Sequence, residues 1–485
     1  MDKLLTKCLI IVVIGMTINV LPVKAKKKQP NVLFIIVDDL RPELNCYGME
    51  YIQSPNIDKL AESGCMFTRS YCNMPVCGAS RASLLTGMYP NRVRFTSYKT
   101  YADEDAPGVV TLPRQFKQNG YSTYSYGKVF HHLDDAVESW SETPWRADYP
   151  NNIHIQEYWR DYRNEENLHT KDEDMPGGAA GPAWERGKVG DDAYYDGKTA
   201  EKAIDKLKSL SKADKPFFMA VGFVKPHLPF NSPSDYWEKY PQEDIQLATN
   251  NYMPENAPKE ANFNSHELRG YTNIPNDKEP LVDSIAYPLK QGYYACVTYV
   301  DKLIGEVLSQ VEESGLGKNT IIVLLGDHGW SLGEHTHWGK HTCFHNSLHT
   351  PLIIKVPGMK PLTQNQVVSY IDIFPTLCEL SGISKPNHLQ GKSLVKTMKG
   401  SSDKSAIAFC RYPNGETIVT DRYTYTEYYD KTGKYLSNMM YDLRLDPMEN
   451  KNISGLPESA EVEKNLQKKL QKHIKKLNSL QNDHE

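Results

Sequence analysis

The sequence contains no C-x-x-C pair, no low-complexity tract and no internal repeat. Without C-x-x-C pairs, a structural zinc site built from cysteines is not expected. The only long apolar run, at residues 9–20, is too short to span a bilayer comfortably. Neither sign of charge dominates, since the formal net charge is −4, and we therefore expect no broad binding of nucleic acid. The 485 residues are enough for a large core and more than one domain.

The first 25 residues have the features of a secretory signal peptide. Lys3 and Lys7 precede the apolar run, and residues 23–25 include a small side chain where a signal peptidase would cut. We expect cleavage there, which leaves a formal charge of −6 on a secreted or periplasmic protein. No stable membrane insertion is expected, and an uncleaved anchor is the alternative.

The cysteines do not define a disulfide framework. Nine are present, and Cys8 lies in the signal segment while Cys77 belongs to a motif described below. The remaining seven are Cys46, Cys65, Cys72, Cys296, Cys343, Cys378 and Cys410. Disulfides can form in an exported protein, but the spacing assigns none of them.

Four short apolar runs have the composition of strands that are buried on both faces. They occupy residues 31–37, 217–223, 320–325 and 351–356. Helix-like stretches lie between them at residues 57–62, 199–210 and 295–315. This alternation predicts an α/β fold with a doubly wound, mostly parallel sheet. Ligands of such sheets bind at the carboxyl ends of the strands.

The other segments predict insertions and a second domain. Residues 138–191 and 228–288 have little periodicity and are interpreted as insertions that shape a substrate cleft, with disordered linkers as the alternative. We place a catalytic domain at residues 26–395 and a smaller domain at 396–485. The smaller domain is expected to hold short antiparallel strands at residues 406–411, 417–421, 423–428 and 438–443. A closing helix presents Val462, Leu466, Leu470, Ile474 and Leu477 on one face.

Acidic residues follow two of the predicted strands. Asp38 and Asp39 end the first strand, and Asp327-His328 follow the strand at 320–325. Carboxylates at neighbouring strand ends predict a shared site for a hard cation, with solvated turns as the alternative. The side chain of His328 is an imidazole, which is a less usual ligand for a hard cation such as calcium and suits softer metals better.

Two further segments carry reactive side chains. In the first, Cys77 and Arg81 lie four residues apart and share one face of a helix near its positive N-terminal end. In the second, Lys128 and His131 provide a positive charge and a proton carrier for an anionic substrate. A buried cysteine and ordinary surface groups are the alternatives for these two segments.

Several motifs together resemble the sulfatase family. Residues 77–87 and 120–131 resemble the two sulfatase signatures. Four segments in the same order as in the iduronate-2-sulfatase branch narrow the resemblance; they are residues 38–42, 127–131, 225–230 and 327–335. The resemblance implies the alkaline-phosphatase-like fold, with a large mostly parallel sheet flanked by helices and a C-terminal domain with an antiparallel sheet and a helix.

The resemblance also implies a set of site residues and cofactors. Cys77 would be oxidised to formylglycine by a maturation enzyme, and its hydrated aldehyde would attack sulfur. One Ca²⁺ would be bound by Asp38, Asp39, Asp327, His328 and residue 77. The catalytic groups would be Cys77, Arg81, Lys128, His131, His227 and Lys340. Substrate-binding roles fall to Lys225, His341 and Trp330, and protonated histidines at 335, 337, 341 and 345 are candidates for binding a uronate carboxylate.

The implied substrate is a sulfated glycosaminoglycan oligosaccharide. Members of the branch remove 2-O-sulfate from uronates of heparan or dermatan sulfate, and the sugar here is either iduronate or an unsaturated uronate. One alternative is a sulfatase for another carbohydrate position. A second is a phosphonate or phosphodiester hydrolase of the same superfamily, and a third is a non-catalytic glycan-binding protein.

Overall fold

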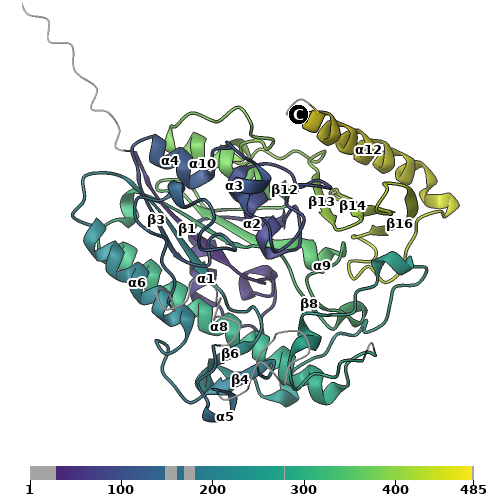
Figure 1. Cartoon of the computed structure of the whole chain (residues 1–485), viewed down its shortest axis with the longest axis horizontal. Coiled ribbons are helices and arrows are strands. Elements are labelled where there is room, and N and C mark those ends of the chain that lie inside the picture. Colours follow the sequence, from purple (N-terminus) through teal and green to yellow (C-terminus); the bar gives the residue numbers. More distant parts are fainter. Residues whose placement is uncertain (1–28, 148–160, 169–180, 278, 483–485) are drawn as a thin grey trace, which may run out of the picture.

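The computed structural model of the protein describes residues 29–147, 161–168, 181–277 and 279–482 (Figure 1). The predicted signal peptide lies outside these residues. Within them, no helix is both long enough and apolar enough to cross a membrane. All eight cysteines of this part of the chain are free thiols.

A large sheet forms the centre of the molecule and has eight strands in the part of the chain that is described. In spatial order its strands are β11 (Leu362–Gln364), β2 (Cys65–Tyr71), β10 (His349–Lys355), β7 (Thr320–Gly326), β1 (Asn31–Val37), β5 (Phe217–Phe223) and β3 (Ser122–Gly127), with β12 (Val368–Ser369) paired to β2. β1 is parallel to both of its neighbours, β5 and β7, and β3 is parallel to β5. β10 runs antiparallel to β7 and β2. The predicted mostly parallel sheet is confirmed.

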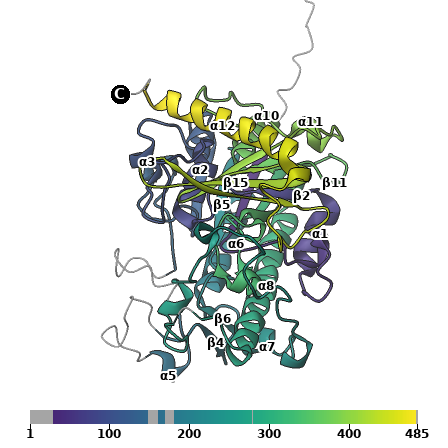
Figure 2. The same cartoon turned by 90° about the vertical axis from the view of Figure 1, so that its right-hand side faces the viewer.

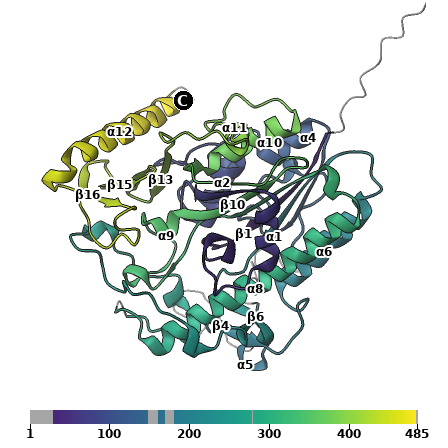
Figure 3. The same ribbon diagram turned by 180° about the vertical axis from the view of Figure 1, so that it is seen from behind.

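Helices cover both faces of this sheet (Figures 1 and 3). One face carries α1 (Pro55–Ser63), α6 (Tyr195–Leu210) and α8 (Asp283–Glu313), and the other carries α2 (Cys77–Thr86), α4 (Leu112–Gln118) and α10 (Ile373–Ser381). Successive side chains of β1 enter the two layers in turn: Leu33 packs in the first and Phe34 in the second. Burial on both sides explains why the strand has a continuous apolar sequence.

The predicted helices are present, but α8 begins twelve residues before the predicted start at 295. Pro288 lies inside its second turn and lacks the N–H that would bond to the carbonyl of Ser284. The loss of one bond near the helix start is tolerated because the following turns bury residues such as Leu289 and Tyr293 in the core. The proline therefore hid the first three turns from the sequence pattern.

Four strands of the sheet, β2, β3, β11 and β12, were not predicted. β3 reads Ser-Thr-Tyr-Ser-Tyr-Gly and has no apolar run, although Thr123, Ser125 and Tyr126 are buried. Its hydroxyl groups find partners, for example Thr123 Oγ1, which donates to the carbonyl of Ser139 at 2.8 Å. Such tertiary bonds allow a polar strand to lie inside the protein.

The C-terminal part forms a second, antiparallel sheet (Figure 2). Its strands are β13 (Ala408–Tyr412), β14 (Gly415–Val419), β15 (Tyr423–Tyr429) and β16 (Tyr435–Asp442). Helix α12 (Ala460–Asn482) covers it, and Leu466 and Leu470 pack against Ile418, Tyr425 and Met440. The boundary at residue 395/396 stays a prediction, and α11 (Val395–Met398) crosses it.

The two predicted insertions contain short elements that pair with each other. β4 (Trp184–Gly187) of the first insertion runs parallel to β6 (Phe230–Pro233) of the second. The insertions also contain α5 (Glu165–Leu168) and α7 (Ser234–Trp237). Four further short elements lie outside the insertions; they are α3 (Ala102–Asp105), α9 (His345–Leu348), β8 (Ser331–Leu332) and β9 (Trp338–Gly339). The described parts of both insertions are therefore folded onto the protein.

Candidate active site

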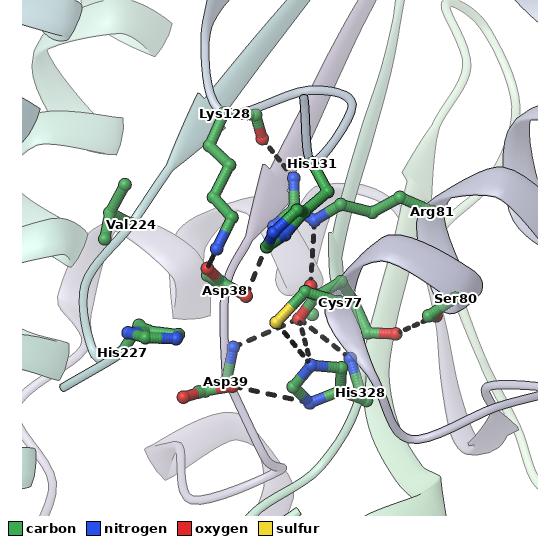
Figure 4. A network of polar contacts seen from close by, with 12 residues as sticks. Asp38, Asp39, Cys77, Ser80, Arg81, Lys128, His131, Val224, His227 and His328 are labelled. Atoms are coloured by element: carbon green, nitrogen blue, oxygen red, sulfur yellow. Dashed lines mark hydrogen bonds and ion pairs between the residues drawn. The ribbon is translucent and has the colours of Figure 1, made fainter. Parts of the chain in front are cut away.

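A buried cluster of polar side chains lies at the carboxyl ends of the parallel strands (Figure 4). Asp38 and Asp39 follow β1, His328 follows β7, and Cys77 is the first residue of α2. Parallel strands place their carboxyl ends at one edge of a sheet, so segments far apart in the sequence meet here. This is the edge at which the sequence predicts a ligand site.

Four of these residues are arranged to hold a cation. One ligand atom from each of Asp38, Asp39, Cys77 and His328 lies within 4.8 Å of all the others. Among the described residues, Asp38 Oδ1 is buried without a hydrogen-bond partner, which is costly unless a cation or another donor reaches it. The four residues therefore fit a metal ion.

The orientation of His328 supports this fit. Its Nδ1 donates to the carbonyl of Gly329 at 3.1 Å, which leaves the lone pair of Nε2 directed at Cys77 Sγ, 3.2 Å away. Burial lowers the pKa of His328 to about 4. The ring is therefore neutral near pH 7, as a metal ligand must be.

Asp327 lies beside this cluster but makes other bonds. Its Oδ2 accepts from Arg81 Nε at 2.8 Å, and its Oδ1 accepts from the amides of Asp39 and His328 at 3.1 and 3.0 Å. Burial, and then the charge of Asp38, raises the pKa of Asp327 to about 7. Metal binding by Asp327 stays a prediction, because its side chain is not among the four mutually close ligands.

Arg81 connects α2 to two strand ends. Its guanidinium is fully buried and donates to Asp327 and, from Nη1, to the carbonyls of Lys128 and Val129, the latter at 3.0 Å. Nη2 lies 3.5 Å from Asp38 Oδ1. A planar fork of donors can hold several acceptors in fixed positions, which a lysine cannot do. Arg81 therefore holds the carboxylates of Asp327 and Asp38 in place.

Lys128 and His131 lie above Asp38 in Figure 4. The ammonium of Lys128 donates to Asp38 Oδ2. Both ring nitrogens of His131 are buried and have no hydrogen-bond partner in the described part of the chain. Burial, and then the charge of Lys128, holds the pKa of His131 well below its usual value. A neutral imidazole with free nitrogens is suited to accept a proton.

His227 and Lys340 form the other side of the site. His227 Nδ1 lies 2.6 Å from the carbonyl of Leu228, so this nitrogen carries a proton. Lys340 Nζ donates to Asp39 Oδ1 at 3.1 Å. Both side chains also contact Glu267, which we did not predict. No sequence signal marks Glu267, since it lies in an insertion without periodicity.

The three predicted substrate-binding residues are in different environments. Lys225 Nζ donates to the carbonyls of His227 and Pro229 at 2.9 and 2.5 Å, and so holds the segment that carries His227. Trp330 is fully buried, with Lys340 Nζ 5.1 Å from its ring centre. Burial does not favour direct contact of Trp330 with a substrate, and the three roles stay predictions.

His341 is the most accessible of the three and lies among aromatic rings. Its ring centre is 4.9 Å from that of His266 and 5.4 Å from that of Tyr412. Burial holds the pKa of His341 well below its usual value, so in the free protein it is a neutral hydrogen-bonding group rather than a cation. The other predicted histidines, 335, 337 and 345, also have lowered pKa values because they are buried.

Comparison with known proteins identifies matches over residues 30–476. The family model described as "Sulfatase" matches residues 30–383, and the model "N-sulphoglucosamine sulphohydrolase, C-terminal" matches residues 333–476. Human iduronate 2-sulfatase is 32% identical over 446 residues, which cover 80% of this chain and 79% of the human protein.

Solved structures share the fold at lower identity. A structure described as BT1596, a 2-O GAG sulfatase, has a TM-score of 0.71 at 22% identity, and the match covers 93% of this chain and 92% of that chain. The phosphonate monoester hydrolase of Agrobacterium radiobacter has a TM-score of 0.71 at 23% identity and covers 94% of this chain and 96% of its own. These two likenesses support the fold alone. The family model that spans most of the chain and the human relative show that the protein belongs to the sulfatase family, and it is a sulfuric ester hydrolase.

Proposed function

We propose that the protein is an exported sulfatase that removes 2-O-sulfate from uronate residues of heparan, dermatan or chondroitin sulfate oligosaccharides. The observation that carries this proposal is the 32% identity with human iduronate 2-sulfatase over about four-fifths of both chains. The motifs at residues 38–42, 127–131, 225–230 and 327–335 support it, because they carry the residues that line the buried cluster. The sugar is iduronate or the unsaturated uronate that a lyase leaves.

Membership in the family implies a formylglycine and a metal ion. We assign the metal as one Ca²⁺, held by Asp38, Asp39, His328 and residue 77, with Asp327 as a further ligand. When present, the cation would polarise a sulfate oxygen, and the hydrated aldehyde formed from Cys77 would supply the nucleophilic oxygen. The carboxylate-rich donor set favours a hard cation, whereas His328 also permits softer ones.

We assign charge stabilisation and proton transfer to side chains according to where they lie in the site. Arg81 and Lys128 bring positive charge to the side of Asp38, where the transferring sulfuryl oxygens would lie. His131 is neutral and has free nitrogens, so it can take a proton from residue 77. His227, aided by Lys340, would donate a proton to the departing sugar oxygen.

The test is sulfate release from 2-O-, 6-O- and N-sulfated heparan disaccharides, with protein shown by intact mass to carry formylglycine at residue 77. Release from 2-O-sulfated uronates alone is the expected result. Release from another position would retain the sulfatase and reject the uronate assignment. A parallel panel of phosphate and phosphonate esters tests the hydrolase alternative, and release from none of these esters would favour a glycan-binding protein.

Export is a separate part of the proposal, and so is maturation by a formylglycine-generating enzyme. The signal segment precedes the described residues, and its cleavage would be seen as a mature N-terminus after residue 25. N-terminal sequencing of the protein from its native host tests this point. A protein that retains residues 1–25 in a membrane fraction would contradict cleavage and favour the anchor.

A further inference from the structure

Glu267 joins the two side chains that we assign to leaving-group protonation. Its Oε1 lies 3.0 Å from His227 Nε2 and 3.1 Å from Lys340 Nζ. Its Oε2 lies 3.1 Å from the same ammonium. Glu267 immediately precedes the 3-10 helix Leu268–Gly270 in the second insertion, far in sequence from both partners. One carboxylate from an insertion thus contacts both members of the pair.

The contacts fix the proton positions on His227. Nδ1 donates to the carbonyl of Leu228 at 2.6 Å, since a carbonyl oxygen can only accept. Nε2 in turn points at a carboxylate oxygen. Both nitrogens therefore face acceptors, and only the doubly protonated ring satisfies both. Nε2 is the nitrogen from which a proton would pass to a leaving oxygen, and Glu267 Oε1 is the acceptor aimed at it.

The charges around this carboxylate explain why it is ionised. Burial by itself would raise the pKa of Glu267, but Lys340 and His227 outweigh burial and hold that pKa well below its usual range. Lys340 is held in turn by Asp39 and lies against the Trp330 ring. The charged or titratable groups that interact with Glu267 or His227 include Lys340, His341, Asp38 and Asp39, together with the phenols of Tyr271 and Tyr412.

We propose that Glu267 is a positioning residue that orients His227 and keeps it protonated until the sulfate ester binds. The proposal rests on the proposed function, because the proton is useful only if an ester oxygen departs beside His227. The glutamate side chain is 23% exposed, whereas that of His227 is 4% exposed, so Glu267 lies on the more accessible side of the pair. An arriving ester oxygen then competes with Glu267 Oε1 for the Nε2 proton.

A purely structural ion pair is the competing explanation, and the two differ in their pH dependence. Loss of a structural contact lowers activity equally at all pH values at which the protein stays folded. Loss of the carboxylate that favours the charged imidazole lowers activity most at high pH, because the neutral ring has no Nε2 proton to donate. The pH profile therefore separates the explanations.

The experiment compares Glu267→Gln with Glu267→Asp, using holoenzyme with confirmed formylglycine and the disaccharide that the wild type cleaves. For Glu267→Gln we expect the alkaline limb of the kcat profile to move to lower pH. The loss of kcat should be about tenfold or more at pH 8 but less than about threefold at pH 5.5. Glu267→Asp keeps the charge on a shorter side chain and should recover part of the loss at pH 8.

Asp277→Asn is the matched control. Asp277 lies in the same insertion and pairs with Arg269 at 3.2 Å, so this variant also removes one carboxylate charge from an ion pair. Its profile should equal that of the wild type. Profiles of Glu267→Gln that superimpose on the wild type, or that are lowered by one factor at every pH, would overturn the proposal.

A second readout does not require turnover. Histidine-selective ¹⁵N NMR, with the His227 signal assigned from a His227→Asn variant, reports the protonation of His227 as a function of pH. In Glu267→Gln this ring should lose its proton at lower pH than in the wild type. If the wild type cleaved no sulfate ester, the proposed function would fail, while this titration would still decide whether Glu267 controls His227. An unchanged titration would reject the proposal directly.

Discussion

At the scale of single residues, Cys77 is the most informative side chain. Burial, and then the charge of Asp38, raises the pKa of its thiol well above the usual value. A buried thiol that stays protonated is a poor nucleophile, because the thiolate is the reactive form. The unmodified side chain is therefore unsuited to the chemistry, in agreement with a requirement for oxidation to formylglycine.

Replacement of this residue should separate activity from folding. We expect Cys77→Ser and Cys77→Ala to lower sulfate release by at least about a thousandfold, as the loss of a nucleophile does in other enzymes. The free energy of unfolding should change by only about 1–2 kcal/mol, because the change in side-chain volume is small. Activity assays together with thermal unfolding followed by circular dichroism measure both quantities.

Cys46→Ser is the control for this prediction. Cys46 is a free, partly exposed cysteine on the far side of β1 from α2, and the same exchange there should leave turnover unchanged. Wild-type turnover in Cys77→Ser, or its failure to fold, would contradict the expected role.

The sequence identified side chains that belong to short, spaced patterns. Cys77 and Arg81 could be placed on one helix face from their spacing alone, and α2 does begin at Cys77. Glu267 could not be found, because its importance comes only from contacts with His227 and Lys340, 40 and 73 residues away. Pairing across such distances depends on the fold and leaves no local signal.

At the scale of secondary structure elements, a glycine allows β5 to pack closely against Lys128, the residue that follows β3. At Gly222 of β5, a Cβ atom would lie 2.0 Å from the carbonyl oxygen of Lys128, which is the acceptor for Arg81. The obstacle is backbone and cannot rotate away. We expect Gly222→Ala to cost about 1–3 kcal/mol of stability.

Activity should also fall in Gly222→Ala. Displacement of Lys128 and Arg81 by a fraction of an ångström should lower kcat by about tenfold or more. Chemical denaturation and sulfate release measure the two effects. Gly190→Ala is the control, because its Cβ would approach only the end of the Asp192 side chain, at 3.0 Å. Equal behaviour of the two variants would show that the strand contact is not limiting.

Helix α12 contains a histidine that should make its attachment sensitive to acid. His473 stacks on Phe409 with ring centres 3.7 Å apart and meets Tyr89 edge-on at 4.6 Å. Burial lowers the pKa of His473 to about 3. The unfolded chain binds this proton near pH 6.5, so between about pH 6.5 and 3 the unfolded state holds more protons and stability falls as the pH falls.

The variant His473→Phe keeps a stacked ring and removes the titration. Its free energy of unfolding should decrease less on going from pH 6.5 to 5.5, by about 1 kcal/mol relative to the wild type. Urea unfolding at the two pH values measures the difference. Asn478→Ala, at an exposed position of the same helix, should retain the wild-type slope. A slope in His473→Phe equal to that of the wild type would mean that His473 is not neutral in the folded protein.

The elements that could be predicted are those whose burial is visible in their own sequence. β1 and β5 have the predicted bounds, because both faces of each strand require apolar residues. β3 escaped prediction because partners elsewhere in the chain satisfy its hydroxyl groups, and the start of α8 was obscured by Pro288. In each case tertiary contacts compensated for an unfavourable local sequence.

At the scale of the whole molecule, the site is assembled from distant parts of the chain. His328 and Cys77 touch although 251 residues separate them, and Asp38 and Asp39 join them from a third segment. Two adjacent carboxylates are buried there, and burial raises the pKa of Asp39. The folded protein therefore carries an electrostatic cost that a bound cation would relieve.

Removal of the metal should accordingly lower both the activity and the thermal stability of the protein. A ligand that binds only the folded state stabilises it by RT ln(1 + [L]/Kd), about 2.7 kcal/mol at a hundredfold excess over Kd. We expect treatment with a chelator to abolish sulfate release and lower Tm, and added Ca²⁺ to restore both. Asp39→Asn should have a Tm that no longer responds to Ca²⁺, whereas Asp277→Asn should respond as the wild type does, because Asp277 pairs with Arg269 and is not one of the clustered ligands. The Tm readout does not depend on formylglycine, so a Tm that is independent of Ca²⁺ in the wild type would reject calcium even if the enzyme were inactive. Recovery of Tm with Mn²⁺ or Zn²⁺ but not with Ca²⁺ would instead show that His328 shifts the site towards softer metals.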